Sequence, residues 1–416
     1  MSEKLTVKNV VNINKSTLSS KENWSTLNYL DTGNITENQI DTLQIFQKGE
    51  KLPSRAKRKV EKGTIIYSTV RPNQKHFGYF DTYSDDLVVS TGFATLDIID
   101  PRVNSKYLYY LLTQNSVISQ LQSIGENSTS SYPSIRPEDI GNLSFMFPDI
   151  DIQNKIADIL TSIDKKIQIN NQINQELEAM AKTLYEYWFV QFDFPDQNGK
   201  PYKSSGGKMV YNPELKREIP EGWGVDSLWN IANFYNGLAM QKYRPDTNED
   251  DYLPVIKIRE MMNGFSKDTE KARLDIPTEA VVERGDILFS WSATLEVIIW
   301  GKERGALNQH IFKVTSDTYP KSFIYFELKS YLKVFKAIAE LRKTTMGHIT
   351  QDHLKQAKIV VPPIEIISKL DAKLQLIMLK QQILENQNQE LTQLRDWLLP
   401  MLMNGQVYKR IEGKND

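Results

Sequence analysis

The stretch SIRPEDIGNLSFMFPDIDIQNKI (134–156) returns 214 positions later as HITQDHLKQAKIVVPPIEIISKL (348–370), and no gap is needed to align the two. The aligned pairs include Ile135 with Ile349, Ile140 with Leu354, Pro148 with Pro362, and Ile156 with Leu370. The same shift superimposes an identical tetrapeptide, Asn-Gln-Glu-Leu, at 174–177 and 388–391. A match of this length at one fixed shift indicates an internal duplication.

A second match lies nearer the start of each copy. VEKGTIIYS (60–68) aligns with VERGDILFS (282–290) at a slightly different shift. Because both matches occur in the same order along the chain, the sequence contains a duplicated unit of about two hundred residues.

Each copy divides into a mixed part and a long helix. Short β-rich runs such as GTIIYS, YLPVIKI and GDILFS are separated by turns, and helical periodicity covers Lys106–Ser119 and Ser322–Leu341. We expect these segments: a first mixed domain (1–150), a central helical spacer (151–190), a connector (191–222), a second mixed domain (223–363), a C-terminal helical spacer (364–404) and a tail (405–416).

The two long helices are expected at about Asp151–Trp188 and Glu365–Met403, each beginning just after proline. Their apolar residues recur every seven positions, which is typical of a helix–helix interface. The expected seams are Ile156, Ile163, Asn170, Leu177 and Leu184, then Ile159, Lys166, Ile173, Met180 and Tyr187, and in the second helix Leu370, Ile377, Leu384, Leu391 and Leu398. Lys166 and Asn170 interrupt the first helix, either as a wetted part of the seam or as a polar contact that fixes its register.

Chain order predicts how the helices pair. The first helix leaves the first domain, and the second must run back to pack on it, so we expect an antiparallel coiled coil and a pseudo-two-fold internal repeat. At about 1.5 Å per residue the first helix would be a rod of roughly 57 Å, longer than one turn of B-DNA at roughly 34–36 Å. The predicted fold class is α+β, with two mixed α/β domains alternating with two long helices.

Composition favours a cytoplasmic protein. Forty per cent apolar and 25% charged residues are ordinary soluble values. The N-terminal stretch does not resemble a signal peptide, and apolar runs such as Val297–Trp300 are too short to cross a bilayer, so no membrane partner is expected. The absence of cysteine and the presence of only four histidines give no reason to expect a metal site.

The charge distribution is uneven although the net charge is −1. Between Lys48 and Lys75 nine basic residues face only Glu50 and Glu61, which leaves a local charge of +7. Such a run favours nucleic-acid binding, and a solvated surface is the alternative.

Enzyme motifs give little support for catalysis. The sequence contains no P-loop, dinucleotide fingerprint, H-E-x-x-H or nucleophile elbow, and Val361-Pro362-Pro363-Ile364 departs at both ends from an amino-methyltransferase tetrapeptide. Pro195-Asp196 with Glu214-Leu215-Lys216 fits the loose PD…ExK pattern of nucleases. These residues lie in a Gly/Ser/Lys/Pro-rich connector without a predicted strand, so a solvated linker is the favoured interpretation.

Several segments resemble the specificity (S) subunits of type I restriction–modification enzymes. They are LYEYWFVQFDFP (184–195), NGKPYKSSGGKMVYNPELKREIPEGW (198–223), VEKGTIIYSTVRPNQ (60–74), SFMFPDIDIQNKIADIL (144–160) and AKIVVPPIEIISKL (357–370). The central stretch is the most specific. The first domain departs from the pattern, because no Pro-x-Gly-Trp lead-in like that at 220–223 precedes it.

This resemblance implies a non-catalytic specificity subunit of a DNA adenine methyltransferase/endonuclease complex. Two target-recognition domains would each read half of a split, asymmetric site in double-stranded DNA, and the helices would set the unread gap. Two methyltransferase (modification) subunits would dock on the helices, and motor-nuclease (restriction) subunits would join for cleavage. S-adenosylmethionine, ATP and Mg would be bound by those partners and none by this chain.

DNA affinity is expected from Lys and Arg on phosphates, and specificity from side chains that reach base edges. Candidates in the first domain are Arg55, Lys57, Arg58, Arg71, Asn73, Gln74, Lys75, His76, Ser130 and Tyr132. Candidates in the second are Gln241, Lys242, Tyr243, Lys257, Arg259, Ser292, Arg342, Lys343, Thr345 and His348. Trp291 is interpreted as core packing. Because the two sets differ, the half-sites should differ.

Partner docking is expected at aromatic residues of the helices, with packing between the helices as the alternative. These residues are Tyr185, Tyr187, Trp188, Phe189 and Trp397. Two other functions stay open: a coiled-coil scaffold that does not bind DNA, and a nuclease built on Asp196, Glu214 and Lys216.

Overall fold

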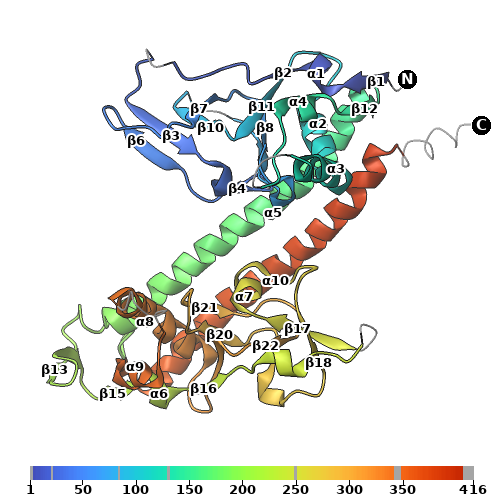
Figure 1. Cartoon of the computed structure of the whole chain (residues 1–416). Coiled ribbons are helices and arrows are strands. Elements are labelled where there is room, and N and C mark those ends of the chain that lie inside the picture. The colour runs from blue at the N-terminus through green and yellow to red at the C-terminus, as the bar shows by residue number, and fades with distance from the viewer. Residues whose placement is uncertain are drawn as a thin grey trace, which may run out of the picture. The chain divides into compact units, whose positions relative to one another are not determined.

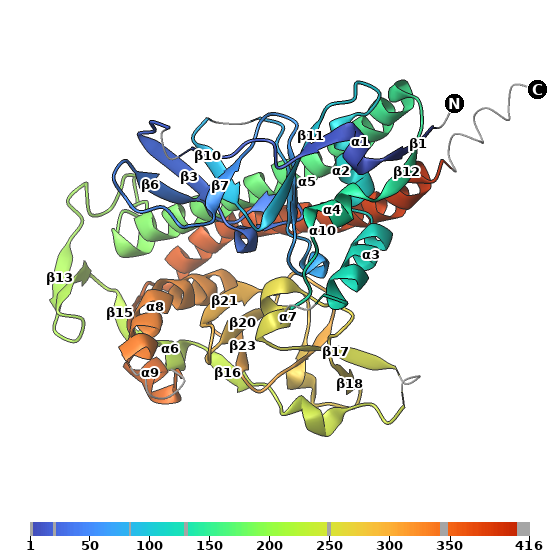
Figure 2. The same ribbon diagram turned by 45° about the horizontal axis from the view of Figure 1, so that its top comes forward.

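The computed structural model describes residues 3–19, 22–82, 85–128, 132–247, 251–341 and 348–405. The chain is an α+β protein that divides into two compact units (Figures 1 and 2). Unit 1 comprises Met1–Gln168 and Asn388–Asp416, and unit 2 comprises Ile169–Gln387. Both long helices, α5 (Ile150–Tyr185) and α10 (Ile364–Met403), are therefore shared between the units.

The described strands of unit 1 form two larger sheets, in the orders β6-β3-β10-β7 and β2-β11-β8-β9, a β4–β5 hairpin and a β1–β12 pair. Their bounds are β1 (Glu3–Thr6), β2 (Val11–Ile13), β3 (Thr26–Leu30), β4 (Ile35–Thr36), β5 (Gln39–Ile40), β6 (Gln44–Gln47), β7 (Ala56–Lys59), β8 (Ile65–Ser68), β9 (Phe77–Tyr79), β10 (Leu87–Ser90), β11 (Phe93–Ile98) and β12 (Ser144–Phe147). The helices are α1 (Val7–Val10), α2 (Ser105–Leu112), α3 (Asn115–Glu126), α4 (Pro137–Gly141) and the 3-10 turns η1 (Thr32–Asn34) and η2 (Pro72–Gln74).

The described strands of unit 2 form sheets in the orders β18-β17-β22-β19 and β16-β23-β20-β21, with the pairs β15–β24 and β13–β14. Their bounds are β13 (Met209–Asn212), β14 (Arg217–Pro220), β15 (Gly224–Ser227), β16 (Asn233–Asn236), β17 (Tyr252–Ile256), β18 (Lys271–Arg273), β19 (Val281–Val282), β20 (Ile287–Ser290), β21 (Glu296–Ile299), β22 (Gly305–Leu307), β23 (Ile311–Thr315) and β24 (Lys358–Val361). The helices are α6 (Leu228–Ile231), α7 (Ile258–Asn263), α8 (Lys321–Leu341), α9 (Gln351–Gln356), a π-helical turn η3 (Glu186–Val190), η4 (Met240–Tyr243) and η5 (Thr278–Ala280).

The strand orders confirm that the two domains are repeats of one fold. The order β2-β11-β8-β9 corresponds to β16-β23-β20-β21, and the parallel pair β3–β10 corresponds to β17–β22. The VEKG and VERG turns lead into β8 and β20, and their glycines, Gly63 and Gly285, have φ values of +91° and +89°. A side chain is strained in this left-handed conformation, so both copies keep glycine at the same turn.

The long helices begin and end close to the predicted residues, but one predicted seam is wrong. Ile159 and Met180 of that seam are 44% and 59% exposed, whereas Leu160 and Ala181, one position later, are buried. Polar residues in the middle of α5 blur the heptad, so the apolar letters alone do not fix the buried face. Asn170 of the other seam is fully buried.

Two local predictions also need correction. The helical stretch Lys106–Ser119 is two helices, because Gln114 adopts an extended conformation between α2 and α3. The connector is more than a solvated linker, since β13 and β14 pair as an antiparallel hairpin within it.

The core of each domain encloses the start of one long helix and the end of the other. In unit 1, Ile156 and Leu160 of α5 share a hydrophobic cluster with Leu402 of α10. In unit 2, Leu370 of α10 shares a cluster with Tyr185 of α5. Burying such side chains contributes about 1.5–3 kcal/mol each, so both ends of each helix are anchored in a domain core.

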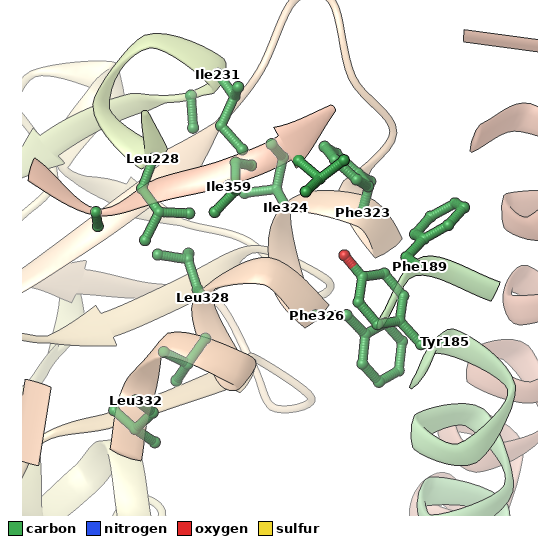
Figure 3. Close-up of a cluster of buried hydrophobic side chains, with 14 of the residues drawn as sticks. Tyr185, Phe189, Leu228, Ile231, Phe323, Ile324, Phe326, Leu328, Leu332 and Ile359 are labelled. Carbon is green, nitrogen blue, oxygen red and sulfur yellow. The ribbon is translucent and has the colours of Figure 1, made fainter. Parts of the chain in front are cut away.

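The end of α5 is anchored by aromatic rings in unit 2 (Figure 3). Tyr185 stacks on Phe326 at a centroid distance of 5.0 Å, and Phe189 meets Phe323 edge-on at 5.9 Å. The hydroxyl of Tyr185 donates a hydrogen bond to Glu327, whose carboxyl is buried. Burial raises the pKa of Glu327 to about 7, against the opposing effects of Tyr185 and Arg217.

We predict that Glu327→Gln stabilises unit 2 at pH 8 but much less at pH 4.5. The folded-state pKa lies above the unfolded value of 4.5. Protonated Glu327 therefore stabilises the folded wild-type chain fully below pH 4.5, and this stabilisation is lost as the pH rises through about 7. The stability gain of the variant over wild type should grow by about 2–3 kcal/mol across this interval. Urea unfolding at both pH values measures it, with the exposed Glu340→Gln on the same helix as the control; equal pH profiles for Glu327→Gln and wild type would contradict the assignment.

Candidate nucleic-acid interface

Three backbone segments of unit 1 meet at one junction. The loop after β8 contacts the β10–β11 turn, where the amide of Thr69 donates to the carbonyl of Gly92 at 2.9 Å. The same loop contacts the segment before α4, where the amide of Ile135 donates to the carbonyl of Thr69 at 2.8 Å and that of Arg71 to Pro133 at 2.9 Å. We call these three segments the unit 1 junction.

The equivalent segments of unit 2 meet in the same way. The amide of Trp291, which follows β20, donates to the carbonyl of His310 at 3.3 Å, and the amide of Ile349 donates to the carbonyl of Trp291 at 2.9 Å. Trp291 corresponds to Thr69 in the VEKG/VERG match, and Ile349 corresponds to Ile135 in the longer match. The repeat therefore conserves the backbone of this unit 2 junction.

The side chains at the unit 1 junction suit an anionic and aromatic ligand. The guanidinium of Arg71 lies 5.9 Å from the ring centre of Tyr132, which is 40% exposed. Arg71 has a φ of +47° and precedes Pro72, so its backbone is held in the left-handed region. Such a fixed, exposed arginine beside an aromatic ring offers a cation for phosphate or guanine and a surface for stacking.

The unit 2 junction presents different chemistry. The indole of Trp291 lies 5.6 Å from the imidazoles of both His310 and His348. Its N–H donates to the side-chain oxygen of Asn236 at 2.9 Å. Trp291 is thus half-buried among polar rings, and not only a core residue as the sequence suggested. His310 was missed because the β22–β23 turn bears no visible sequence match to its counterpart, and Asn236 was missed because no motif marks the end of β16.

The structure brings only part of the predicted first-domain set to the junction. The carbonyl of Arg55 accepts from Thr91 beside Gly92 at 2.8 Å, and its side chain is exposed. Asn73 and Gln74 are exposed on η2, and Lys57 is exposed on β7. Arg58 is half-buried on β7, where burial lowers its pKa.

Lys75 and His76 point elsewhere. The ammonium of Lys75 pairs with Glu37 at 2.5 Å, and Nδ1 of His76 contacts the carbonyl oxygen of Ile35 at 2.5 Å. Both partners belong to the β4–β5 hairpin and its turn, so these two side chains attach the recognition loop to its own domain. Ser130 lies outside the described residues.

The second-domain candidates are more scattered. Lys257 is not on a strand but caps α7, and its bond to Glu270 at 2.5 Å lowers the pKa of that carboxyl. Arg259 pairs with Glu260 at 2.6 Å, and Ser292 is buried. Gln241 and Lys242 are exposed and Tyr243 is half-buried, all three on η4. Arg342, Lys343 and Thr345 lie outside the described residues.

The expectation of an exposed aromatic docking surface is wrong for most of its members. Tyr185, Trp188 and Phe189 are buried in the core of unit 2, and Tyr187 is half-buried. Trp397 on α10 is 60% exposed and alone of the five keeps a large free ring. The other four rings pack where the end of α5 meets the core of unit 2.

The carboxylates of the nuclease alternative have structural partners. Asp196 accepts the amides of Asn198 and Lys200, both at 2.8 Å, and so closes its own turn. Glu214 pairs with Lys358 of β24 at 2.8 Å. Across the described ranges, no cluster of three or more histidine or acidic side chains is arranged to hold a metal ion. No described helix has the length and apolarity to span a bilayer.

Comparison with known proteins identifies the family. The description "Type I restriction modification DNA specificity domain" matches residues 2–179 and 220–393. The chain is 27% identical to the type I restriction enzyme HindI specificity subunit of Haemophilus influenzae, covering 91% of this chain and 94% of that protein. It is also 27% identical to the MjaIX specificity subunit of Methanocaldococcus jannaschii, covering 91% and 83%.

A solved structure supports the fold. The crystal structure of the type I restriction–modification S subunit from M. genitalium is 15% identical and matches with a TM-score of 0.53 over 97% of this chain and 96% of that one. With two matched repeats and the same architecture, this chain belongs to the type I restriction–modification DNA specificity family.

We predict that the purified chain does not cleave duplex DNA with Mg²⁺, and that Lys216→Ala changes nothing in that assay. The reason is that Asp196 and Glu214 are engaged in structural contacts that do not converge on a metal. Gel analysis of supercoiled plasmid measures nicking. Mg²⁺-dependent cleavage abolished by Lys216→Ala would establish the nuclease instead.

Proposed function

We propose that this chain is the DNA-specificity subunit of a type I restriction–modification complex and reads two unlike half-sites, one with each junction. The observation that carries this proposal is the conserved backbone of the two junctions combined with different side chains. A shared scaffold holds the readers in equivalent positions, and Arg71 with Tyr132 reads a different sequence from Trp291, His310 and His348.

The two long helices form the spacer. In unit 1, Asp164 of α5 bonds Arg395 of α10 at 3.2 Å. In unit 2, Asn170 and Gln387 meet at 3.5 Å, and the carbonyl of Asn174 accepts from Gln381 at 3.3 Å. Rising numbers on α5 meet falling numbers on α10, which supports an antiparallel coiled coil with a pseudo-two-fold repeat. Residues 1–150 and 223–363 are then the target-recognition domains, 151–190 and 364–404 the spacers, and 191–222 and 405–416 the connector and tail.

The proposed complex supplies the chemistry. The specificity chain is non-catalytic and cytoplasmic, while two modification subunits carry S-adenosylmethionine and methylate adenine, and restriction subunits use ATP and Mg. The exposed ring of Trp397 on α10 is the aromatic docking point that the packing leaves free.

The decisive experiment is co-expression with a modification subunit, followed by mapping of methylated adenines across the host genome. We expect one split motif with a fixed gap. Unsplit motifs, or methylation independent of this chain, would refute the proposal.

Variants at the two junctions should relax different half-sites. Arg71→Ala should weaken binding to the first half-site by about 1–3 kcal/mol and leave discrimination at the second half-site intact. His348→Ala should do the reverse. Competition binding with duplexes altered in one half measures both. Lys208→Ala, at an exposed side chain just before β13 in the connector, is the control. Equal loss at both half-sites in either variant counts against separate readers.

Salt dependence separates this function from a scaffold. Binding to mixed duplex DNA should weaken steeply between 50 and 200 mM salt. On a plot of the logarithm of the binding constant against the logarithm of the salt concentration, the slope should be about −0.9 for each phosphate contact. A scaffold would show no such binding at any of these salt concentrations.

A further inference from the structure

The β4–β5 hairpin is fastened to the recognition loop that follows β8. Its turn residues Glu37 and Asn38 both have positive φ, at +46° and +66°. The amide of Glu37 donates to the carbonyl of Lys75 at 3.0 Å, and the Lys75 ammonium returns to the Glu37 carboxylate at 2.5 Å. The amide of Asn38 donates to the carbonyl of Phe77 at 2.9 Å. The loop and the hairpin are therefore held together by main-chain and side-chain bonds.

The other oxygen of Glu37 faces the helix pair of unit 1. It lies 4.0 Å from Nη2 of Arg395 on α10. Nη1 of Arg395 bonds Asp164 of α5 at 3.2 Å, and the second oxygen of Asp164 accepts from Tyr110 of α2 at 2.6 Å. The Arg395 side chain is only 20% exposed, so solvent screens its ion pair with Asp164 less than it screens an ion pair on the surface.

A charge contact joins the hairpin to the helices beside a cleft. A cleft of about 190 Å³ lies between them, and its lining includes Gln39, Asp41, Ile167 and Thr392 as well as Glu37 and Arg395. Nη2 of Arg395 also bonds Asp396 of its own helix at 3.0 Å, so it lies between the carboxylates of Asp396 and Glu37. The charge contacts from Lys75 through Glu37 and Arg395 to Asp164 thus link the recognition loop to α5 and α10.

Unit 2 has a different insertion at the equivalent place in its fold. The hairpin lies between β3 and β6, and the corresponding position between β17 and β18 holds α7. There the end of α7 at Gly264 closely approaches Lys302, which lies near Glu385 of α10. Burial lowers the pKa of Lys302 and raises that of Glu385. The insertion of unit 2 therefore approaches α10 through Lys302 of the β21–β22 turn, whereas that of unit 1 approaches it through Glu37.

We propose that Arg395 is a positioning residue for DNA specificity: through Glu37 it sets the seating of the first recognition loop on the helix pair, and so the gap between the half-sites. This inference rests on the proposed function. It assigns Arg395 no contact with DNA.

The test uses the full chain assembled with its modification subunits. Duplexes carry both half-sites with the native gap or with one base pair added or removed. Arg395→Met and Glu37→Gln should each lower the preference for the native gap by about two- to tenfold, and the double variant should lose no more than Arg395→Met alone, because the two residues act as one unit. Arg395→Lys should restore part of the preference. Arg102→Met is the matched control, since Arg102 also joins two carboxylates of the first domain, Glu3 and Asp100, but its side chain pairs with neither long helix.

The outcomes are distinguishable. A purely structural loss would weaken binding to all three duplexes equally and leave the preference unchanged, which would overturn the role of Arg395. If the wild-type complex itself showed no gap preference, the proposed function would fail before this inference was reached.

Discussion

The fold depends on one constraint: each domain core needs the start of one long helix and the end of the other. Leu402 comes from the far end of the sequence, yet it completes the core that holds Leu160. Closing so long a loop costs entropy that local contacts do not repay. The core of unit 1 is therefore complete only with the end of α10 in place, and the stability of each domain is tied to the long helices.

This arrangement separates what is constant from what varies. Backbone bonds at Thr69 and Trp291 hold the same three segments together in both repeats, while the exposed side chains around them are unrelated in chemistry. Hydrogen bonds between main-chain groups do not depend on residue identity, so reading residues can change without loss of the junction. In unit 1, Arg395 adds a charged contact between the long helices and the β4–β5 hairpin, which is bonded to the loop after β8.

Much of the architecture could be predicted from the sequence because the duplication repeats residues as well as structure. The matched segments gave the domain order, the helix limits and the equivalence of β8 with β20. The site was harder to predict. Lys75 looked free, but a hairpin 38 residues earlier provides its partner Glu37, and Ser292 follows a strand but turns inward. The junction itself joins segments far apart in sequence, and His310 has no local signal that marks it. The seam of α5 was misplaced because polar residues occupy its middle.

The left-handed backbone of Arg71 has a consequence for how this protein could acquire new targets. Proline follows immediately and limits any rearrangement of the loop. Glycine, asparagine and aspartate enter such a conformation at little cost, whereas β-branched side chains do so at a considerable one. Under the proposed function, retargeting through Arg71 therefore starts from a small set of residue types, and wider change must come from other side chains of the junction.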